Sequence, residues 1–161
     1  MTSGPKLGNI AANKETWFDQ VEIPSHVPDL QKIVDSKFSH FLAPIVGNYY
    51  RSQIAQRIYQ KLKVGDLVYL VFDPKNKFDK NAVKVLTHPK DDNGKSHHLG
   101  FVDRYNAGKM VEIVQECFYI YYAGYGMYKK FVPIDVEFVF EICKVNEFGD
   151  IKIQFKDSVI F

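Results

Sequence analysis

Short β-type segments separated by turn residues fill most of the chain, and this succession constrains its fold more than any other feature. In residues 151–155, Ile and Phe alternate with Lys and Gln at the period of a half-buried strand. Asn93-Gly94 and residues 146–149 supply turn chemistry, and Pro44 places the first segment at an edge or a bulge. The pattern predicts a mainly β fold, a small OB-like or modified β-barrel of about six strands. Strands are expected over residues 38–46, 67–72, 82–86, 98–102, 118–123, 136–142 and 151–155.

Two helices are predicted to flank this barrel. The first is capped by Ser52 and runs through Lys61. Its apolar face has helical spacing and consists of Ile54, Ala55, Ile58 and Leu62. The second begins at Asp103 or Asn106 and ends at Glu116, and its inward residues are Met110, Ile113 and Val114.

Residues 1–37 are predicted to form an N-terminal extension. Residues 1–16 contain Gly4, Pro5 and Gly8 and have the composition of a flexible lead. A short amphipathic helix follows Pro28-Asp29 and ends near Lys37. The sequence therefore divides into an extension packed on the main domain, residues 1–37, and a barrel domain, residues 38–161.

Composition excludes several classes of protein. The net charge of +2 excludes a polyanion binder driven by bulk charge, although a local basic patch can still hold nucleic acid. Aromatic residues make up 15% of the chain, which favours a β-rich core, a stacking surface, or both. Cys117 and Cys143 are too few for a disulfide framework and fit small buried roles in a reducing compartment.

Targeting and catalytic signals are missing from the sequence. No segment has the length and apolarity to span a membrane, and the N-terminus lacks a secretory apolar region. We expect an intracellular protein, cytoplasmic in a prokaryote or nuclear in a eukaryote. His88, His97, His98 and Cys117 fit no zinc spacing, and no nucleophile elbow or glycine-rich phosphate loop occurs. The prediction is a non-enzymatic protein without metal or cofactor.

A dense run of tyrosines occupies residues 119–128. On the predicted strand, Tyr119 and Tyr121 share one face, opposite Phe118 and Ile120. This arrangement favours a half-buried strand with tyrosines at its rim. A stacking platform for nucleotides is the alternative, because two lysines follow the run.

The loop between the second and third predicted strands carries the most informative residues. Asn76, Asp79 and Asn81 can bond to the backbone and rigidify the loop, which is ordinary turn chemistry. The alternative is that this rigid loop presents Phe78 and Asp79 to a ligand.

Four separated pieces of the chain resemble the HIRAN domain, over about residues 38–142. The pieces are Ile45-Val46-Gly47 followed by Tyr49-Tyr50, then Gly65-Asp66-Leu67-Val68-Tyr69-Leu70, then Asn76-Lys77-Phe78-Asp79-Lys80-Asn81-Ala82-Val83-Lys84-Val85, and Leu99-Gly100-Phe101-Val102. The resemblance implies an OB-like barrel with flanking helices. Such domains occur in eukaryotic DNA-repair translocases and alone in bacteria and phages, and the best-understood members grip the 3′-hydroxyl end of single-stranded DNA.

The resemblance also implies roles for individual residues. Phe78 matches the aromatic that stacks on the terminal base, and Asp79 matches the carboxylate that accepts the 3′-OH hydrogen bond. The second stacking aromatic is Tyr49 or Tyr50, and the sequence leaves this choice open. A further basic position matches Arg104.

Two departures from the family pattern affect phosphate binding. Phe101 stands where the family can carry His, so only a backbone amide could serve there. The family can carry an Arg before the first-strand aromatic, but here the nearest basic residue is Arg51, after Tyr50.

Three functions remain open from the sequence. The leading prediction is a non-catalytic binder of the 3′ end of single-stranded DNA. The runner-up is a protein-interaction module that docks a partner in an aromatic groove of the same barrel, and a nuclease is a weaker third. The basic residues Arg51, Arg57, Lys61 and Lys63 form either a solvated helix face or a basic patch beside the tyrosines.

Overall fold

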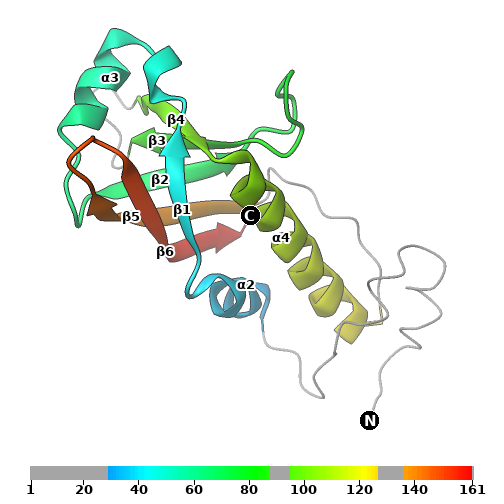
Figure 1. The fold of residues 1–161 in the computed structure, drawn as a ribbon. Helices are drawn as coiled ribbons and strands as arrows, with labels where there is room; N and C mark the ends of the chain where they lie inside the picture. The colour runs from blue at the N-terminus through cyan, green and yellow to red at the C-terminus, as the bar shows by residue number, and fades with distance from the viewer. Residues whose placement is uncertain (1–28, 88–94, 127–135, 161) are drawn as a thin grey trace.

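The computed structural model of the chain describes residues 29–87, 95–126 and 136–160. Six strands close into an antiparallel barrel in the order β1-β4-β3-β2-β5-β6, which confirms the predicted mainly β fold (Figure 1). The strands are β1 (Leu42–Val46), β2 (Leu67–Phe72), β3 (Val83–Thr87), β4 (His98–Val102), β5 (Val136–Val145) and β6 (Ile151–Ile160). The predicted flexible lead and the Asn93-Gly94 turn lie outside the described residues.

Strand β1 lies between two neighbours and not at an edge. Residues 42–44 pair with β6, whereas Ile45 and Val46 pair with β4. Pro44, which lacks an N–H donor, lies where the pairing changes from one neighbour to the other. The predicted strand over residues 38–46 therefore starts too early, because Phe38 ends a helix and a turn separates it from Leu42.

Three helices accompany the barrel in the described part of the chain: α2 (Leu30–Phe38), α3 (Gln53–Gln60) and α4 (Arg104–Gly124). The predicted cap at Ser52 is confirmed, and Asp103 rather than Asn106 caps α4, because each accepts a backbone N–H in the first turn of its helix. Asp29 caps α2 in the same way. On α3, Ala55 is buried as expected, but Ile54 is exposed. The predicted inward position of Ile54 is therefore wrong.

Helix α4 corrects the largest error of the sequence analysis. Residues 118–123, predicted as a strand, continue the helix that starts at Arg104. Met110, Val114 and Cys117 are buried at helical spacing, and no Gly or Pro interrupts the chain between Gly108 and Gly124. The aromatic run has strand propensity, but packing of this face against the core overrides it. Tyr119 is buried, so the tyrosines do not form the predicted strand rim.

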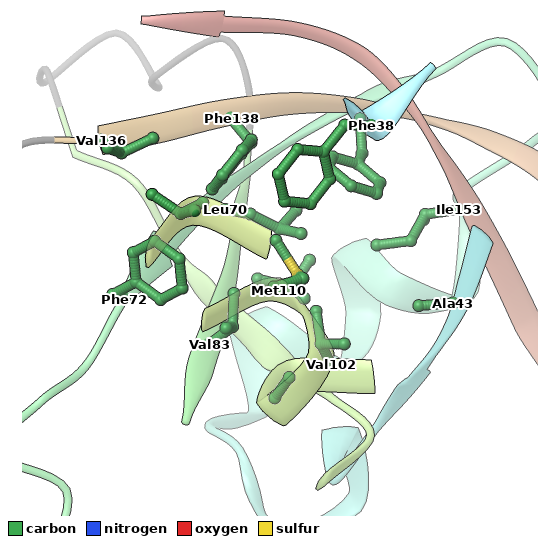
Figure 2. Packing of buried hydrophobic residues seen from close by; sticks show 14 of the residues in the cluster. Phe38, Ala43, Leu70, Phe72, Val83, Val102, Met110, Val136, Phe138 and Ile153 are labelled. Atoms are coloured by element: carbon green, nitrogen blue, oxygen red, sulfur yellow. The ribbon is translucent and has the colours of Figure 1, made fainter. Parts of the chain in front are cut away.

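A cluster of aromatic rings fills the barrel beneath α2. Phe38 is fully buried, and its ring centroid lies 4.9 Å from that of Phe138 and 5.7 Å from that of Phe155. Met110 of α4 enters the same core (Figure 2). Burial of a side chain of the size of Phe contributes about 1.5–3 kcal/mol. Helix α2 is therefore joined to the barrel by its own core residues.

The two cysteines occupy different environments. Cys117 is buried as predicted, and burial raises the pKa of its thiol to about 12. Cys143 lies partly exposed at a register shift in β5, with its Sγ 3.4 Å from the Lys152 carbonyl oxygen, so its predicted buried role is wrong. Among the described residues, no helix has the length and apolarity needed to cross a membrane.

Candidate nucleic-acid interface

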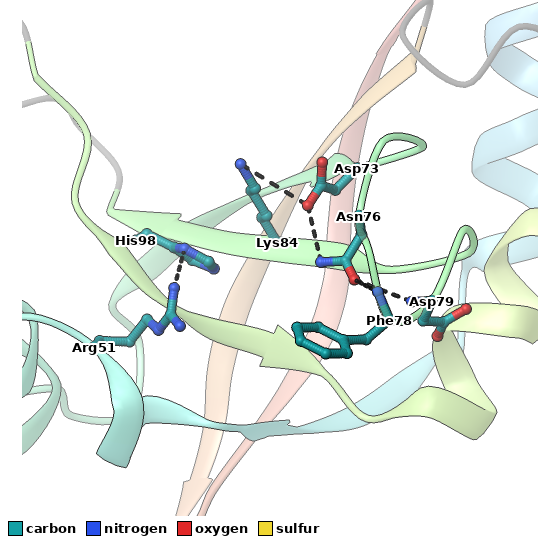
Figure 3. A network of polar contacts seen from close by, with 7 residues as sticks. All are labelled: Arg51, Asp73, Asn76, Phe78, Asp79, Lys84 and His98. Carbon is teal, nitrogen blue, oxygen red and sulfur yellow. Dashed lines mark hydrogen bonds and ion pairs between the residues drawn. The ribbon is translucent and has the colours of Figure 1, made fainter.

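The loop between β2 and β3 is fixed by the side chain of Asn76. Asn76 Oδ1 accepts hydrogen bonds from the N–H groups of Phe78 at 2.9 Å and Asp79 at 3.0 Å (Figure 3). Asn76 Nδ2 donates to Asp73 Oδ2 at 3.1 Å, and this oxygen also lies 4.0 Å from Lys84 Nζ. The loop therefore holds Phe78 and Asp79 in a set orientation, which is the turn chemistry expected of Asn and Asp.

Phe78 lies uncovered at the tip of this loop, with 90% of its surface exposed. The loop thus combines a fixed backbone with an uncovered aromatic ring. Tyr49 and Tyr50 are also exposed, by 82% and 79%, on the short helix η2 (Asn48–Tyr50) that follows β1. Three exposed aromatic rings on two such segments provide apolar faces that a base or an apolar side chain can cover.

Asp79 is sheltered beside the exposed ring. Its side chain is only 19% exposed, and its Oδ1 accepts the Asn81 N–H at 2.9 Å. Its Oδ2 lies 3.8 Å from Nε of Arg104, the first residue of α4. Because 81% of the Arg104 side chain is exposed, this cation remains accessible to a ligand.

Close packing against β4 fixes the position of η2. A Cβ atom on Gly100 would lie 2.5 Å from the Val46 carbonyl oxygen, so only glycine allows β1 to approach β4 this closely. Asn48 Nδ2 then donates to the Leu99 carbonyl oxygen at 2.8 Å. Asn48 thus anchors η2 to the barrel.

Arg51 forms a compact group with two residues of β4. Its Nη1 lies 2.8 Å from His98 Nδ1, and its guanidinium carbon lies 5.5 Å from the Phe101 ring centroid. Burial, followed by the charge of Arg51, lowers the pKa of His98 to about 4. His98 is therefore neutral at physiological pH and accepts a hydrogen bond from Arg51, which carries the positive charge.

The predicted site residues fall into two groups on the outside of the barrel. Arg51 lies against His98 and Phe101 of β4, and Asp79 and Arg104 are in contact beyond the C-terminal end of the same strand. Tyr49 and Tyr50 touch edge to face, with ring centroids 5.5 Å apart. Lys84 connects the two groups, because it is the cross-strand partner of Phe101 and lies near Asp73 of the loop.

Sequence reasoning missed two members of this surface. The sequence marks His98 only as a candidate metal ligand and Lys84 only as part of a predicted strand. The signal that could have found Lys84 is its place between two apolar strand residues, Val83 and Val85, because alternation along a strand directs it to the outer face. Within the described residues, no group of three His, Cys, Asp or Glu side chains could hold a metal ion.

Comparison with protein families decides the relationship. The model of the HIRAN domain family matches residues 32–142. The chain belongs to the HIRAN family. HIRAN domains are DNA-binding modules and are generally non-catalytic, so family membership supports nucleic-acid binding by this chain.

Two solved structures are similar to the chain. A protein from Lactobacillus plantarum is similar with a TM-score of 0.50 and 17% sequence identity, over 74% of this chain and 94% of that one. The HIRAN domain of human HLTF is similar with a TM-score of 0.42 and 19% identity, over 75% of this chain and 76% of that one. No curated protein sequence matches the chain.

Proposed function

We propose that this HIRAN domain captures the 3′-hydroxyl end of single-stranded DNA without catalysing a reaction on it. The observation that carries the proposal is the juxtaposition of an exposed ring, Phe78, and a sheltered carboxylate, Asp79, in a loop fixed by Asn76. The ring can stack on any base, and the carboxylate accepts a hydrogen bond from one hydroxyl. These two groups together select the end of a strand and not a base sequence.

Stacking supplies the affinity in this proposal. A base stacked on an aromatic side chain contributes about 1–3 kcal/mol with little discrimination between bases. Phe78 offers one exposed face, and Tyr49 or Tyr50 is the second aromatic that encloses the terminal base. Because Asn76 already fixes the loop, little further ordering of the backbone is needed on binding.

Asp79 supplies the selectivity for a 3′-hydroxyl. A hydroxyl donates a hydrogen bond to the carboxylate, whereas a 3′-phosphate would place two negative groups together. Arg104 balances the carboxylate and offers its exposed guanidinium to the nearest phosphate. Arg51 and the backbone amide of Phe101 are the further proposed phosphate contacts along β4.

The experiment is fluorescence anisotropy with a short labelled strand that ends in a 3′-OH or in a 3′-phosphate. We expect the wild-type chain to prefer the 3′-OH strand. The substitution Asp79→Asn keeps the size of the side chain but removes its negative charge. It should therefore weaken binding of the 3′-OH strand and reduce the discrimination against the 3′-phosphate strand. Equal affinity of the wild-type chain for both ends would refute end capture.

Phe78→Ala tests the stacking step. Loss of one stacked base predicts an affinity lower by about tenfold, equal to about 1.4 kcal/mol. Tyr125→Ala is the matched control, because Tyr125 is also an exposed aromatic but follows the far end of α4. If both variants lost the same amount of affinity, or neither lost any, Phe78 would not be a stacking residue of the site.

A protein-interaction module is the second candidate function. The exposed rings of Tyr49, Tyr50 and Phe78 and the net charge of +2 favour it, because an apolar peptide needs no phosphate contacts. Salt separates the two candidates, since affinity for phosphates falls log-linearly with salt and affinity of an apolar groove does not.

A further inference from the structure

The turn between β5 and β6 repeats the design of the Phe78 loop. Asn146 Oδ1 accepts hydrogen bonds from the N–H groups of Phe148 at 3.0 Å and Asp150 at 2.8 Å. Phe148 is 83% exposed, so a second aromatic ring is presented by a turn that an Asn side chain fixes. In Figure 1 this turn lies at the end of the barrel below α3, away from the loop that carries Phe78.

Two lysines beside this turn face each other across the strands. Lys144 of β5 and Lys152 of β6 are direct cross-strand partners, and both are exposed. A register shift between Ile142 and Lys144 brings Lys144 to the face that carries Lys152. Like charges directly opposite each other destabilise a sheet, and neither lysine has an ion pair within the described part of the chain. This arrangement is complementary to an anion.

A continuous row of outward-facing residues joins these lysines to the proposed end-capture site. Lys84 pairs with Phe101, and Phe101 pairs with Val46 of β1. Pro44, two residues earlier on β1, pairs with Lys152, which in turn pairs with Lys144. With neighbouring strands about 4.8 Å apart, the four steps from β3 to β5 span roughly 19 Å.

The middle of this row is apolar and its ends are basic. Val46 is exposed at the centre, Lys84 and Arg51 lie toward the Phe78 side, and Lys152 and Lys144 lie on the other. Glu141 of β5 is paired with Lys156, and the turn between the two lysines carries Glu147 and Asp150, neither of which forms an ion pair with Lys144 or Lys152 within the described residues. The alternation of cations and apolar surface suits a single-stranded nucleic acid, whose phosphates and bases need both.

We propose that this row is a track for the DNA strand 5′ of the captured end, with Lys152 and Lys144 holding phosphates and Phe148 stacking on a base. The proposal rests on the proposed function, because the 3′ end fixes where the strand starts. OB-type folds hold about 4–16 nucleotides, so a strand that is longer than a few nucleotides should reach Phe148.

The test compares a trinucleotide and a dodecanucleotide, both with a 3′-OH, by anisotropy on the full chain. The variants are the double substitution Lys144→Gln/Lys152→Gln and the single substitution Phe148→Ala. Each is expected to weaken dodecanucleotide binding by roughly fivefold or more while trinucleotide binding stays unchanged. The control is Lys37→Gln/Lys156→Gln, which removes the same charge from lysines that the structure pairs with Glu116 and Glu141.

The outcomes separate the track from end capture. Unchanged dodecanucleotide affinity in both variants, or a loss matched by the control or by the trinucleotide, would overturn the track. If the variants lose affinity only for the dodecanucleotide and the wild-type chain does not prefer a 3′-OH end, the track is supported and end capture is refuted. Absence of DNA binding in the wild-type chain at low salt would overturn both.

Discussion

Gly100 shows how one residue sets the geometry of the site. An added Cβ would lie 2.5 Å from the Val46 carbonyl oxygen and 3.3 Å from the Asn48 amide nitrogen, so β1 or η2 must move in Gly100→Ala. We expect this variant to lose about 1–3 kcal/mol of stability, the usual cost of overpacking, and to bind DNA more weakly. Chemical denaturation measures the first effect.

Gly108→Ala is the matched control for this prediction. Gly108 lies within α4, and an added Cβ there would have no neighbour within 4 Å. Alanine stabilises a helix interior relative to glycine by up to about 1 kcal/mol, so this variant should gain stability. If the two variants unfolded at the same denaturant concentration, the close approach at Gly100 would not constrain the fold.

His98 makes stability depend on pH. Its pKa is about 4 in the folded protein, below the ordinary value of 6.5, because of burial and then the charge of Arg51. The unfolded chain therefore binds the proton more readily, and stability falls as pH decreases from about 6.5 toward 4. The variant His98→Asn lacks the titrating imidazole, so its stability should not have this pH dependence. The excess of the wild-type unfolding free energy over that of the variant should therefore decrease as the pH is lowered from about 6.5 to 4. A constant difference would contradict the assignment.

The sequence identified side chains better than it identified their neighbours. Phe78 and Asp79 could be singled out because an Asn-aromatic-Asp loop has a local chemical logic. The contact between Arg51, His98 and Phe101 could not be derived, because it depends on the pairing register of β1 with β4. Register and long-range contacts follow from packing of the whole barrel, which no local pattern records.

Among the elements, the Phe78 loop gives a direct prediction. Asn76→Ala removes the acceptor of two backbone N–H groups, and each such hydrogen bond contributes about 0.5–1.5 kcal/mol. We expect faster hydrogen exchange at the Phe78 and Asp79 amides and weaker binding of a 3′-OH trinucleotide, because the loop must be ordered on binding.

The control for this prediction is Asn146→Ala in the β5–β6 turn. It removes the same kind of bonds from the Phe148 and Asp150 amides. Trinucleotide affinity should then remain at the wild-type level while exchange at Phe148 becomes faster. Equal trinucleotide affinity in Asn76→Ala and wild type would show that rigidity of the Phe78 loop does not contribute to binding.

Helices α2 and α4 show where element prediction succeeds and fails. The cap of α3 at Ser52 was predicted correctly and that of α4 was narrowed to Asp103 or Asn106, because a cap is a local hydrogen bond between neighbours in sequence. The end of α4 was missed because residues 118–123 have strand propensity but lie on a buried helical face. The division at residue 37 stays a prediction, although Leu30, Ile33 and Val34 of α2 share the barrel core.

At the scale of the whole molecule, barrel closure follows from the sequence pattern more readily than the strand order. Alternating burial along residues 151–155 of β6 matches the alternation of Ile and Phe with Lys and Gln, and the succession of short strand segments between turns predicts a barrel. The placement of β1 between β4 and β6 was not predictable, because Pro44 indicated an edge or a bulge. That placement matters for function, since it joins the Phe78 side of the barrel to the lysines of β5 and β6.

Salt dependence tests the functional argument for the molecule as a whole. The net charge of +2 is too small to attract DNA generally, so binding must come from the few cations on the outer face of the barrel. For single strands, log K falls with log salt with a slope of about −0.7 for each neutralised phosphate. With about two phosphates held near the captured end, a trinucleotide should give a slope near −1.4.

A dodecanucleotide that also engages Lys144 and Lys152 holds about four phosphates, which predicts a slope of roughly −3. Lys144→Gln/Lys152→Gln should return this slope to the trinucleotide value, while Lys37→Gln/Lys156→Gln should leave it unchanged. Anisotropy titrations at several salt concentrations measure these slopes. A slope that does not increase with strand length would mean that the strand leaves the barrel after the captured end, and a slope near zero would favour an apolar partner.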